Sequence, residues 1–240
     1  MSDDRFSRFG ILVGGGACAK LRGAKVLVCG LGAVGGFALE ILARCGVENF
    51  VLADGDTFEL SNLNRQICAL ESTLGRPKAE VERERVLDIN PAARVEVFPN
   101  FIDDENLAFL LGKRPDVVVD AIDSLPAKIS LIRGALLSDI KLVSSMGAAR
   151  RLCADFIKTA PLKKSHGCPM AAEIRRRLRA QGVDFSACEC VFSDEPAAGN
   201  SHLRGGPGER VLGSYAAVTS IFGIRLADLA ISSLLRDVVR

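Results

Sequence analysis

The stretch from Lys25 to Asp54, KVLVCGLGAVGGFALEILARCGVENFVLAD, constrains the fold more than any other part of the chain. An apolar run breaks at Gly30, passes into Gly-Leu-Gly-Ala-Val-Gly, and continues with helical spacing of apolar residues to Gly46. A second apolar run, residues 50–53, stops at Asp54. Strand, glycine turn, helix, strand and acid, in that order, predict the βαβ unit that binds nucleotides.

The three glycines of this unit have separate physical roles. Gly30 permits a tight turn, Gly32 lets a phosphate approach the backbone, and Gly35 allows the helix to pack close to the strand. The free N–H groups and the dipole at the helix start favour a negatively charged phosphate. Asp54 is placed to accept hydrogen bonds from ribose hydroxyls. The unit therefore predicts a bound nucleotide, but NAD, FAD and ATP all carry a ribose and phosphates.

The composition sets limits on the size, charge and thiol chemistry of the protein. The 240 residues are enough for one large domain, or for a domain with an appendage. The net charge is only +2, which gives no overall electrostatic case for a nucleic-acid partner. Eight cysteines are scattered and no CxxC pair occurs, so we expect reduced, buried thiols and no four-cysteine zinc site. The first ten residues lack the apolar core of a signal peptide, so we expect a cytoplasmic protein.

Strand and helix patterns alternate after Asp54. Helices are expected over 76–89, 103–112 and 126–138, and strands over 94–98, 116–122 and 141–144. Such alternation specifies a Rossmann-like α/β fold, a doubly wound and mainly parallel sheet with right-handed crossovers. We expect residues 1–147 to form the nucleotide-binding part with a short N-terminal lead-in. Residues 148–240 are expected to form a C-terminal strand and helix extension of the same domain.

The character of the chain changes after Gly147. We expect a strand over 151–158, outside the alternating series, and a helix over 170–180 with an arginine-rich face. Nine Lys or Arg residues stand against two acids between 150 and 179, a basic region within a nearly neutral chain.

Two further C-terminal segments have distinct compositions. Residues 196–209 are rich in Gly and Pro and are expected to form a flexible loop. The stretch 211–235 is apolar for most of its length, but Arg225 and Asp228 lie in its middle. Because two charges near a bilayer centre are costly, a buried helix at a subunit interface is favoured over a membrane span.

Charged residues that follow Asp54 separate the possible nucleotides. Arg65 follows the second strand, and Lys78 lies at the start of a helix. Asp120 and Asp123 flank Ala-Ile at the end of a buried strand, beside the expected switch point of the sheet. A triphosphate needs its charge neutralised before pyrophosphate leaves, whereas hydride transfer does not. Cations with an extra carboxylate therefore favour ATP and magnesium, and an NAD-dependent oxidoreductase stays as an alternative.

Seven segments resemble the ubiquitin-activating-type (ThiF/MoeB) superfamily of ATP-dependent adenylating enzymes. They are RFSRFG (5–10), GLGAVG (30–35), DGD (54–56), SNLNRQ (61–66), GRPK (75–78), INP (89–91) and DAIDS (120–124). The resemblance covers residues 5–147. It implies adenylation, in which a substrate carboxylate attacks the α-phosphate of ATP, releases pyrophosphate and leaves an acyl-adenylate.

The resemblance also implies roles for individual residues. Asp54 would bind the ribose and Asp123 would hold Mg²⁺. Arg65 and Lys78 would contact the phosphates, and Arg8 would reach the neighbouring subunit's site, which implies a homodimer. The implied nucleotide-binding residues are Gly30, Gly32, Ala33, Val34, Gly35, Asp54, Asp56, Asn62, Arg65, Gln66, Lys78, Asp123 and Ser124, and the implied catalytic residues are Arg8, Arg65, Lys78 and Asp123.

Within this superfamily the chain is most similar to the tRNA threonylcarbamoyladenosine dehydratases. The likeness rests on DAIDS (120–124), KT (158–159), CVFS (190–193) and GSYAAVT (213–219), and the two CxxC zinc pairs of the sulfur-carrier activators are absent. It implies ATP-dependent closure of the threonine carboxylate of the modified tRNA onto its own carbamoyl group. It also implies a working partnership with a cysteine desulfurase or sulfur-acceptor system. The alternative is an activator of a ubiquitin-like or sulfur-carrier protein.

The basic region fits a tRNA substrate. Cationic side chains can bind tRNA phosphates electrostatically without reading the base sequence. The candidate residues are Arg150, Arg151, Lys163, Lys164, Arg175, Arg176, Arg177 and Arg179. Three cysteines, Cys168, Cys188 and Cys190, are candidate acyl or persulfide acceptors, and Cys168-Pro169 departs from the family's pattern. Because ring closure needs no thioester, we expect these cysteines to be structural or redox-linked.

Overall fold

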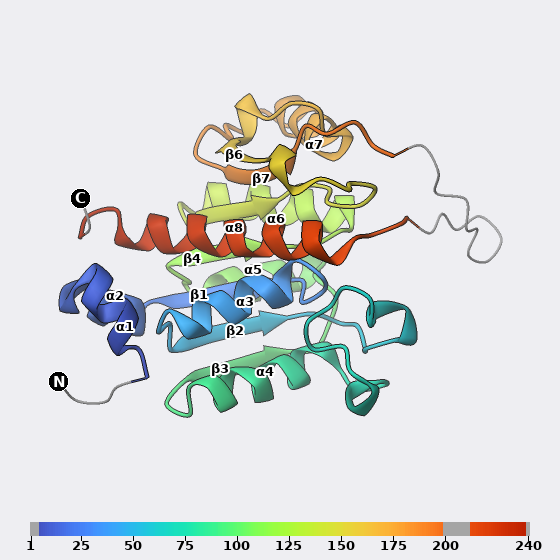
Figure 1. The fold of residues 1–240 in the computed structure, drawn as a ribbon. Helices are drawn as coiled ribbons and strands as arrows, with labels where there is room; N and C mark the ends of the chain where they lie inside the picture. Colours follow the sequence, from blue (N-terminus) through green and yellow to red (C-terminus); the bar gives the residue numbers. More distant parts are fainter. Residues whose placement is uncertain (1–4, 199–211, 239–240) are drawn as a thin grey trace.

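The computed structural model describes residues 5–198 and 212–238. Within these residues, seven strands form one sheet in the order β3-β2-β1-β4-β5-β7-β6 (Figure 1). Every neighbouring pair is parallel except β6 and β7, which run antiparallel. The expected Rossmann-like, doubly wound and mainly parallel sheet with a C-terminal extension is confirmed.

The strands are short, and those at the centre of the sheet are almost wholly buried. Every residue of β4 is buried, because helices cover both faces of the sheet there. The strands are β1 (Lys25–Cys29), β2 (Asn49–Ala53), β3 (Arg94–Phe98), β4 (Val117–Asp120), β5 (Lys141–Ser145), β6 (Ile157–Pro161) and β7 (Glu189–Ser193).

Helices lie on both faces of the sheet. They are α1 (Ser7–Val13), α2 (Gly15–Gly23), α3 (Gly35–Arg44), α4 (Lys78–Ile89), α5 (Asp104–Gly112), α6 (Leu125–Leu137), α7 (Pro169–Ala180) and α8 (Ala216–Leu235). One core layer joins α3, α4 and α8 to side chains such as Val26 and Val28 of β1. The other joins α5, α6 and α7 to Leu27 and Cys29, because successive side chains of a strand point to opposite faces.

The alternating series has the predicted order and nearly the predicted bounds. The start of α5 shows why: the Asp103 carboxylate accepts hydrogen bonds from the backbone N–H groups of Glu105 and Asn106, at 3.0 and 2.9 Å. Such caps are local in the sequence and can be identified from it. The expected flexible loop lies mostly outside the described residues, from position 199 onward.

The predicted strand over 151–158 is wrong. Residues 151–153 have no regular structure, 154–156 form a short 3-10 turn, and the strand β6 runs from Ile157 to Pro161. The backbone N–H groups of Leu152 and Cys153 donate to the Glu195 carboxylate at 3.1 Å instead of joining a strand. The apolar residues before β6 therefore resemble a strand in sequence but belong to a loop.

Helix α8 is the one described helix that is long and apolar enough to cross a membrane, by length and composition alone. Its most apolar window is 50% buried within the structure, where residues such as Phe222 and Leu226 pack on the sheet. Arg225 and Asp228 lie on its exposed side. The expected burial of this helix is thus explained by the sheet of its own chain.

The two edges of the sheet differ in what they carry. The carboxyl ends of the parallel strands meet at one edge, where α3 begins, whereas α1 and α2 lie at the opposite edge (Figure 1). Ligands of open α/β sheets bind at the carboxyl edge, where the strand order reverses. Here the reversal falls between β1 and β4.

Candidate active site

The glycine turn between β1 and α3 is shaped by steric limits at two positions. Gly30 has a φ of 84°, in the left-handed region, and its N–H donates to the carbonyl of Ala53 at 2.9 Å. A Cβ on Gly35 would lie 1.8 Å from the Gly30 carbonyl oxygen, so this position accepts no side chain. A Cβ on Gly32 would meet nothing closer than 3.7 Å. Gly32 therefore leaves open space at the turn, which a phosphate can use.

Asp54 is held beside this turn by backbone hydrogen bonds. Its Oδ2 accepts from the N–H of Leu31 at 2.6 Å, and its Oδ1 accepts from the N–H of Asp56 at 2.8 Å. Burial raises the pKa of the Asp54 carboxyl above its usual value, and these two hydrogen bonds partly oppose the rise. Each oxygen has lone-pair capacity left for a ribose hydroxyl.

Lys78 lies next to Asp54 at the start of α4. It is only 5% exposed, and its Nζ forms an ion pair with Asp56 Oδ2 at 3.0 Å. Its backbone N–H also donates to the Asp56 carbonyl, at 2.9 Å. Asp56 therefore holds the ammonium near Asp54 until an anionic ligand competes for it.

The polar side chains of the segment 61–66 have two roles: some bond to the segment itself or to a residue just before it, and one faces the glycine turn. Asn62 accepts from the N–H of Glu59 at 3.1 Å and so caps its own turn. Arg65 donates through Nη1 to the Ser61 carbonyl at 2.7 Å, which folds it back on the segment. Gln66 is 7% exposed, its Nε2 is the atom nearest to the Cβ position of Gly32, and its Oε1 has no hydrogen-bond partner in the described structure. Gln66, rather than Asn62, faces the glycine turn.

The loop from β4 to α6 brings Asp123 and Ser124 to the same turn. A Cβ on Gly30 would lie 2.7 Å from the carbonyl oxygen of Ala121, so the two loops are in direct contact. Asp123 and Ser124 are both exposed. Within the described residues, the Asp123 carboxylate makes no hydrogen bond or ion pair.

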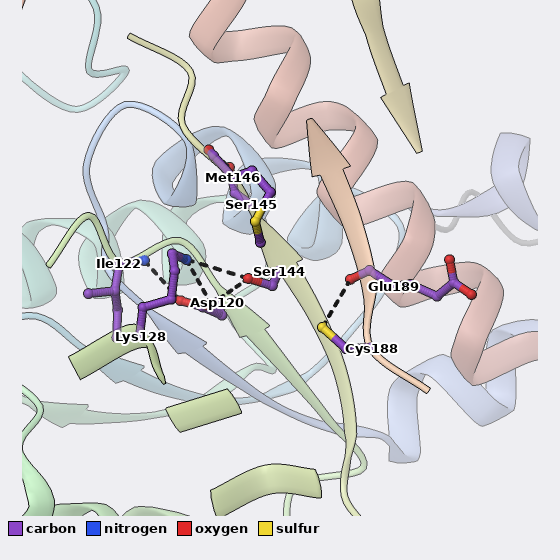
Figure 2. A network of polar contacts seen from close by, with 8 residues as sticks. All are labelled: Asp120, Ile122, Lys128, Ser144, Ser145, Met146, Cys188 and Glu189. Carbon is purple, nitrogen blue, oxygen red and sulfur yellow. Dashed lines mark hydrogen bonds and ion pairs between the residues drawn. The ribbon is translucent and has the colours of Figure 1, made fainter. Parts of the chain in front are cut away.

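Asp120 has a different environment from Asp123, although the sequence places them together. Figure 2 shows Lys128 and Ser144 converging on the buried Asp120 carboxylate. Lys128 Nζ lies 2.7 Å from Asp120 Oδ2, and Ser144 Oγ donates to the same oxygen at 2.6 Å. Both side chains of the ion pair are 0% exposed, and the N–H of Ile122 donates to Asp120 Oδ1 at 3.1 Å. Asp120 therefore stabilises the start of the loop that carries Asp123.

Sequence reasoning missed Lys128 and Ser144. Lys128 lies within a mostly apolar helix and Ser144 within a buried strand. No spacing rule pairs either residue with Asp120, and an unexplained lysine among apolar residues is the one sequence signal that was available.

Arg8 does not join these residues within one chain. It is exposed on α1, at the edge of the sheet opposite to the glycine turn (Figure 1). Its predicted role in a neighbouring subunit's site therefore stays a prediction.

The eight cysteines are free thiols. The three candidate acceptors are buried, with Cys168 4% exposed and Cys188 and Cys190 0% exposed. They lie in the apolar core, as expected for reduced, buried thiols. Burial raises the pKa of Cys188 well above its usual range and that of Cys190 to about 12, which disfavours a thiolate nucleophile. In the described part of the chain, no group of three or more His, Cys, Asp or Glu side chains could hold a metal ion.

Two of the residues expected to contact tRNA phosphates are held within their own chain. The Arg150 guanidinium donates to the Ala198 carbonyl at 2.9 and 2.6 Å, so it joins two loops of its own chain. Arg151 is 3% exposed and cannot contribute to an exposed basic face.

The remaining basic residues gather on and beside α7. Arg176 and Arg177 both pair with Glu173, at 2.6 and 2.7 Å, and Arg179 lies 5.6 Å from the centre of the Phe185 ring. Arg175 is half-buried and donates to Ser165, whereas Lys163 and Lys164 are exposed. The exposed basic face is therefore formed by Lys163, Lys164, Arg176 and Arg179, with the half-buried Arg177 beside them.

Comparison with known proteins gives close matches over nearly the whole chain. The model of the ThiF family matches residues 6–237. A tRNA threonylcarbamoyladenosine dehydratase of Bacillus subtilis (strain 168) is 34% identical over 244 residues, which span 98% of this chain and 96% of that protein. The crystal structure of the E. coli tRNA N6-threonylcarbamoyladenosine dehydratase in complex with ATP matches with a TM-score of 0.89 at 34% identity, covering 97% of this chain and 94% of that one.

A second group of relatives matches less of the chain. The molybdopterin-synthase adenylyltransferase of Escherichia coli (strain K12) is 38% identical over 132 residues, which are 55% of this chain and 52% of that protein. The likeness to the dehydratases therefore extends over a much larger share of the sequence than the likeness to the molybdopterin-synthase adenylyltransferase.

Proposed function

The chain belongs to the ThiF family, and from this membership we propose that it uses ATP to cyclise threonylcarbamoyladenosine in tRNA, with loss of water. The observation that carries the proposal is the similarity to dehydratases over 98% of the chain. The matched span includes the C-terminal extension. The molybdopterin-synthase adenylyltransferase matches only 55% of the chain.

The proposed reaction has two steps. A threonine carboxylate oxygen forms a bond to the α-phosphorus of ATP, and the bond to the departing pyrophosphate breaks. An atom of the carbamoyl group then bonds to the acyl carbon, AMP leaves with the former carboxylate oxygen, and a carbamoyl N–H gives up its proton. A carboxylate is a poor electrophile, so adenylation supplies the leaving group, and the enzyme has to hold the chain in a ring-closing geometry.

The residues at the carboxyl edge of the sheet suit the first step. Asp54 has lone pairs free for the ribose, and Gly32 leaves space for a phosphate beside the helix start. Lys78, freed from Asp56 by the phosphates, would offset their charge. Arg65 is the second predicted phosphate contact, after a change from its present hydrogen bond to the Ser61 carbonyl.

Asp123 fits the predicted Mg²⁺ ligand. It is an exposed carboxylate on the loop that contacts the glycine turn, whereas Asp56 pairs with Lys78 and Asp120 is neutralised by Lys128. Mg²⁺ commonly takes one or two carboxylates together with substrate phosphates and waters, which a single free aspartate allows. When bound, the ion would draw charge from the phosphates as pyrophosphate leaves.

A homodimer is part of the proposal. Helix α1 has no buried residue and exposes Ile11 and Leu12 at 72% and 80%. Exposed apolar side chains next to Arg8 support an interface through which Arg8 reaches the partner's site.

We also propose that the basic face around α7 grips tRNA phosphates and that the enzyme works in the cytoplasm. A partnership with a cysteine desulfurase or sulfur-acceptor system rests on the family resemblance alone.

The experiment that tests the proposal is nucleoside mass spectrometry of tRNA from a strain that lacks this gene. The proposal predicts that the cyclic modification disappears and that threonylcarbamoyladenosine accumulates. Unchanged tRNA would contradict it. ATP–pyrophosphate exchange that needs a carrier protein ending in Gly-Gly, and not tRNA, would favour the carrier-activating alternative instead.

A further inference from the structure

Among the residues that the structure describes, Arg151 is a buried cation without an anionic partner. It is 3% exposed, and its Nε and Nη1 have no hydrogen-bond partner among the described residues. Its Nη2 donates to the Gly167 carbonyl at 3.4 Å, which is a long contact for a hydrogen bond. A buried, unpaired charge is strongly unfavourable, so this guanidinium requires a counter-charge that the described structure lacks.

We propose that Arg151 binds the carboxylate of the molecule that the enzyme adenylates. This inference rests on the proposed function, because it assigns the second substrate's position in the same site. A guanidinium offers fixed charge and several donors, and carboxylates are the ligands that match it most closely. It would also offset the repulsion between that carboxylate and the triphosphate.

The position of Arg151 along the sheet supports this role. Asp54 follows β2, the glycine turn follows β1, and Asp123 follows β4. The loop that carries Arg151 follows β5, the next strand in the order β2-β1-β4-β5. Asp54, the glycine turn and Asp123 thus come first along this edge of the sheet, and Arg151 comes next. A carboxylate on Arg151 would approach the phosphates from the side opposite to the ribose.

Two acids are linked to Arg151 through neighbouring residues, Asp194 through Gly167 and Glu195 through Leu152, and each already has a partner. Gly167, which accepts the long contact, packs on Asp194: a Cβ on Gly167 would lie 2.8 Å from the Asp194 Cα. Asp194 Oδ2 pairs with Lys158, and with His166 at 3.1 Å. The pKa of the Asp194 carboxyl is lowered, first by the hydrogen bond from Lys158.

Glu195 is likewise engaged. Both of its carboxylate oxygens accept from the backbone N–H of Leu152, and Oε2 also accepts from that of Cys153. Asp194 Oδ1 remains buried and without a partner, so an ion pair between Arg151 and Asp194 is the competing arrangement. The test has to separate a bound carboxylate from that internal pair.

The first arm compares Arg151→Met, Arg151→Lys and Asp194→Asn with the wild-type enzyme. Arg133→Met, which removes an exposed arginine of α6, is the matched control. Arg151→Met is expected to raise the KM for threonylcarbamoyladenosine-bearing tRNA about tenfold to hundredfold, from the loss of charge-assisted hydrogen bonds. ATP affinity stays at the wild-type value, and Arg151→Lys recovers part of the KM. The midpoint of thermal unfolding of the ligand-free Arg151→Met enzyme does not fall, because the substitution removes an uncompensated buried charge. If Arg151→Met instead lowers the unfolding midpoint as Asp194→Asn does and leaves KM unchanged, the internal pair is correct and the inference is overturned.

The second arm identifies the carboxylate that Arg151 binds. It also tests the role of Arg151 separately from the proposed tRNA substrate. Binding is measured for the nucleoside threonylcarbamoyladenosine and its carboxamide, and for a peptide ending in Gly-Gly and its amide. The expected result is that wild-type enzyme prefers the nucleoside acid over its carboxamide and that Arg151→Met does not. Arg151-dependent preference for the peptide acid alone would keep the role of Arg151 and overturn the proposed tRNA substrate. Equal binding of acid and amide in both pairs would overturn the role of Arg151, whatever the tRNA analysis shows.

Discussion

The buried ion pair of Asp120 and Lys128 gives the sharpest prediction about stability. Both side chains are 0% exposed and their charged atoms lie 2.7 Å apart. Lys128→Met leaves the Asp120 carboxylate buried without its cation, and removing one partner of a buried pair costs about 3–5 kcal/mol. For a domain of this size, about 1 kcal/mol shifts the unfolding midpoint by roughly 2–4 °C, so we expect a loss of roughly 6–20 °C.

A surface pair supplies the control for this prediction. Lys20 and Asp237 lie 3.5 Å apart with side chains 36% and 78% exposed. Because exposed pairs contribute about 0–1 kcal/mol, Lys20→Met is expected to shift the midpoint by only a few degrees at most. Differential scanning calorimetry of both variants in the same buffer makes the comparison.

The double variant Asp120→Asn, Lys128→Met tests the cause. With both charges removed, Ser144 can still hydrogen-bond to the amide, so the double variant should be more stable than Lys128→Met alone. A Lys128→Met midpoint equal to that of Lys20→Met would refute the reasoning. A double variant less stable than the single one would refute it as well.

The remaining predictions concern the glycine turn, a buried acid and the basic face. Gly35→Ala should lower the unfolding midpoint, because its Cβ would lie 1.8 Å from a carbonyl oxygen, whereas Gly32→Ala should fold normally and lose ATP affinity in calorimetric titration. Glu82 is 2% exposed, and burial is the main cause that raises its pKa to about 8. The pKa of Glu82 in the folded protein lies above its unfolded value of about 4.3. The stabilising contribution of its protonated side chain is therefore complete below about pH 4.3 and is lost as the pH rises through about 8. Glu82→Gln should therefore have a urea midpoint that falls less than the wild-type midpoint between about pH 5 and pH 8. Lys163→Ala with Lys164→Ala should weaken tRNA binding and reduce the slope of log affinity against log salt by about 1–2, measured by filter binding.

Much of the fold could be predicted because its signals are local. The glycine turn before α3 and the aspartate cap of α5 each lie within a few residues of the element that they start. The strand predicted over 151–158 was wrong because its backbone donors bind Glu195, more than 40 residues away. A sequence pattern contains no information on such a contact.

The residues of the candidate site also fall into those that a local sequence motif predicts and those that depend on long-range contacts. The glycines and Asp54 follow from one continuous motif, and the structure places them together. Lys128 and Arg151 depend on tertiary contacts, since one pairs with a neighbouring strand and the other is buried among loops. Arg151 in particular was assigned to an exposed basic face, because composition alone cannot separate a buried arginine from its exposed neighbours.

The central claim is that a substrate carboxylate is adenylated, and the fate of one oxygen atom tests it most directly. Purified enzyme is given ATP, Mg²⁺ and tRNA whose threonylcarbamoyladenosine carries heavy oxygen in its carboxylate. The account predicts a cyclic nucleoside that has lost one water, together with AMP that contains one heavy oxygen from the carboxylate. Heavy oxygen in inorganic phosphate with release of ADP, or cyclic product with unlabelled AMP, would contradict it.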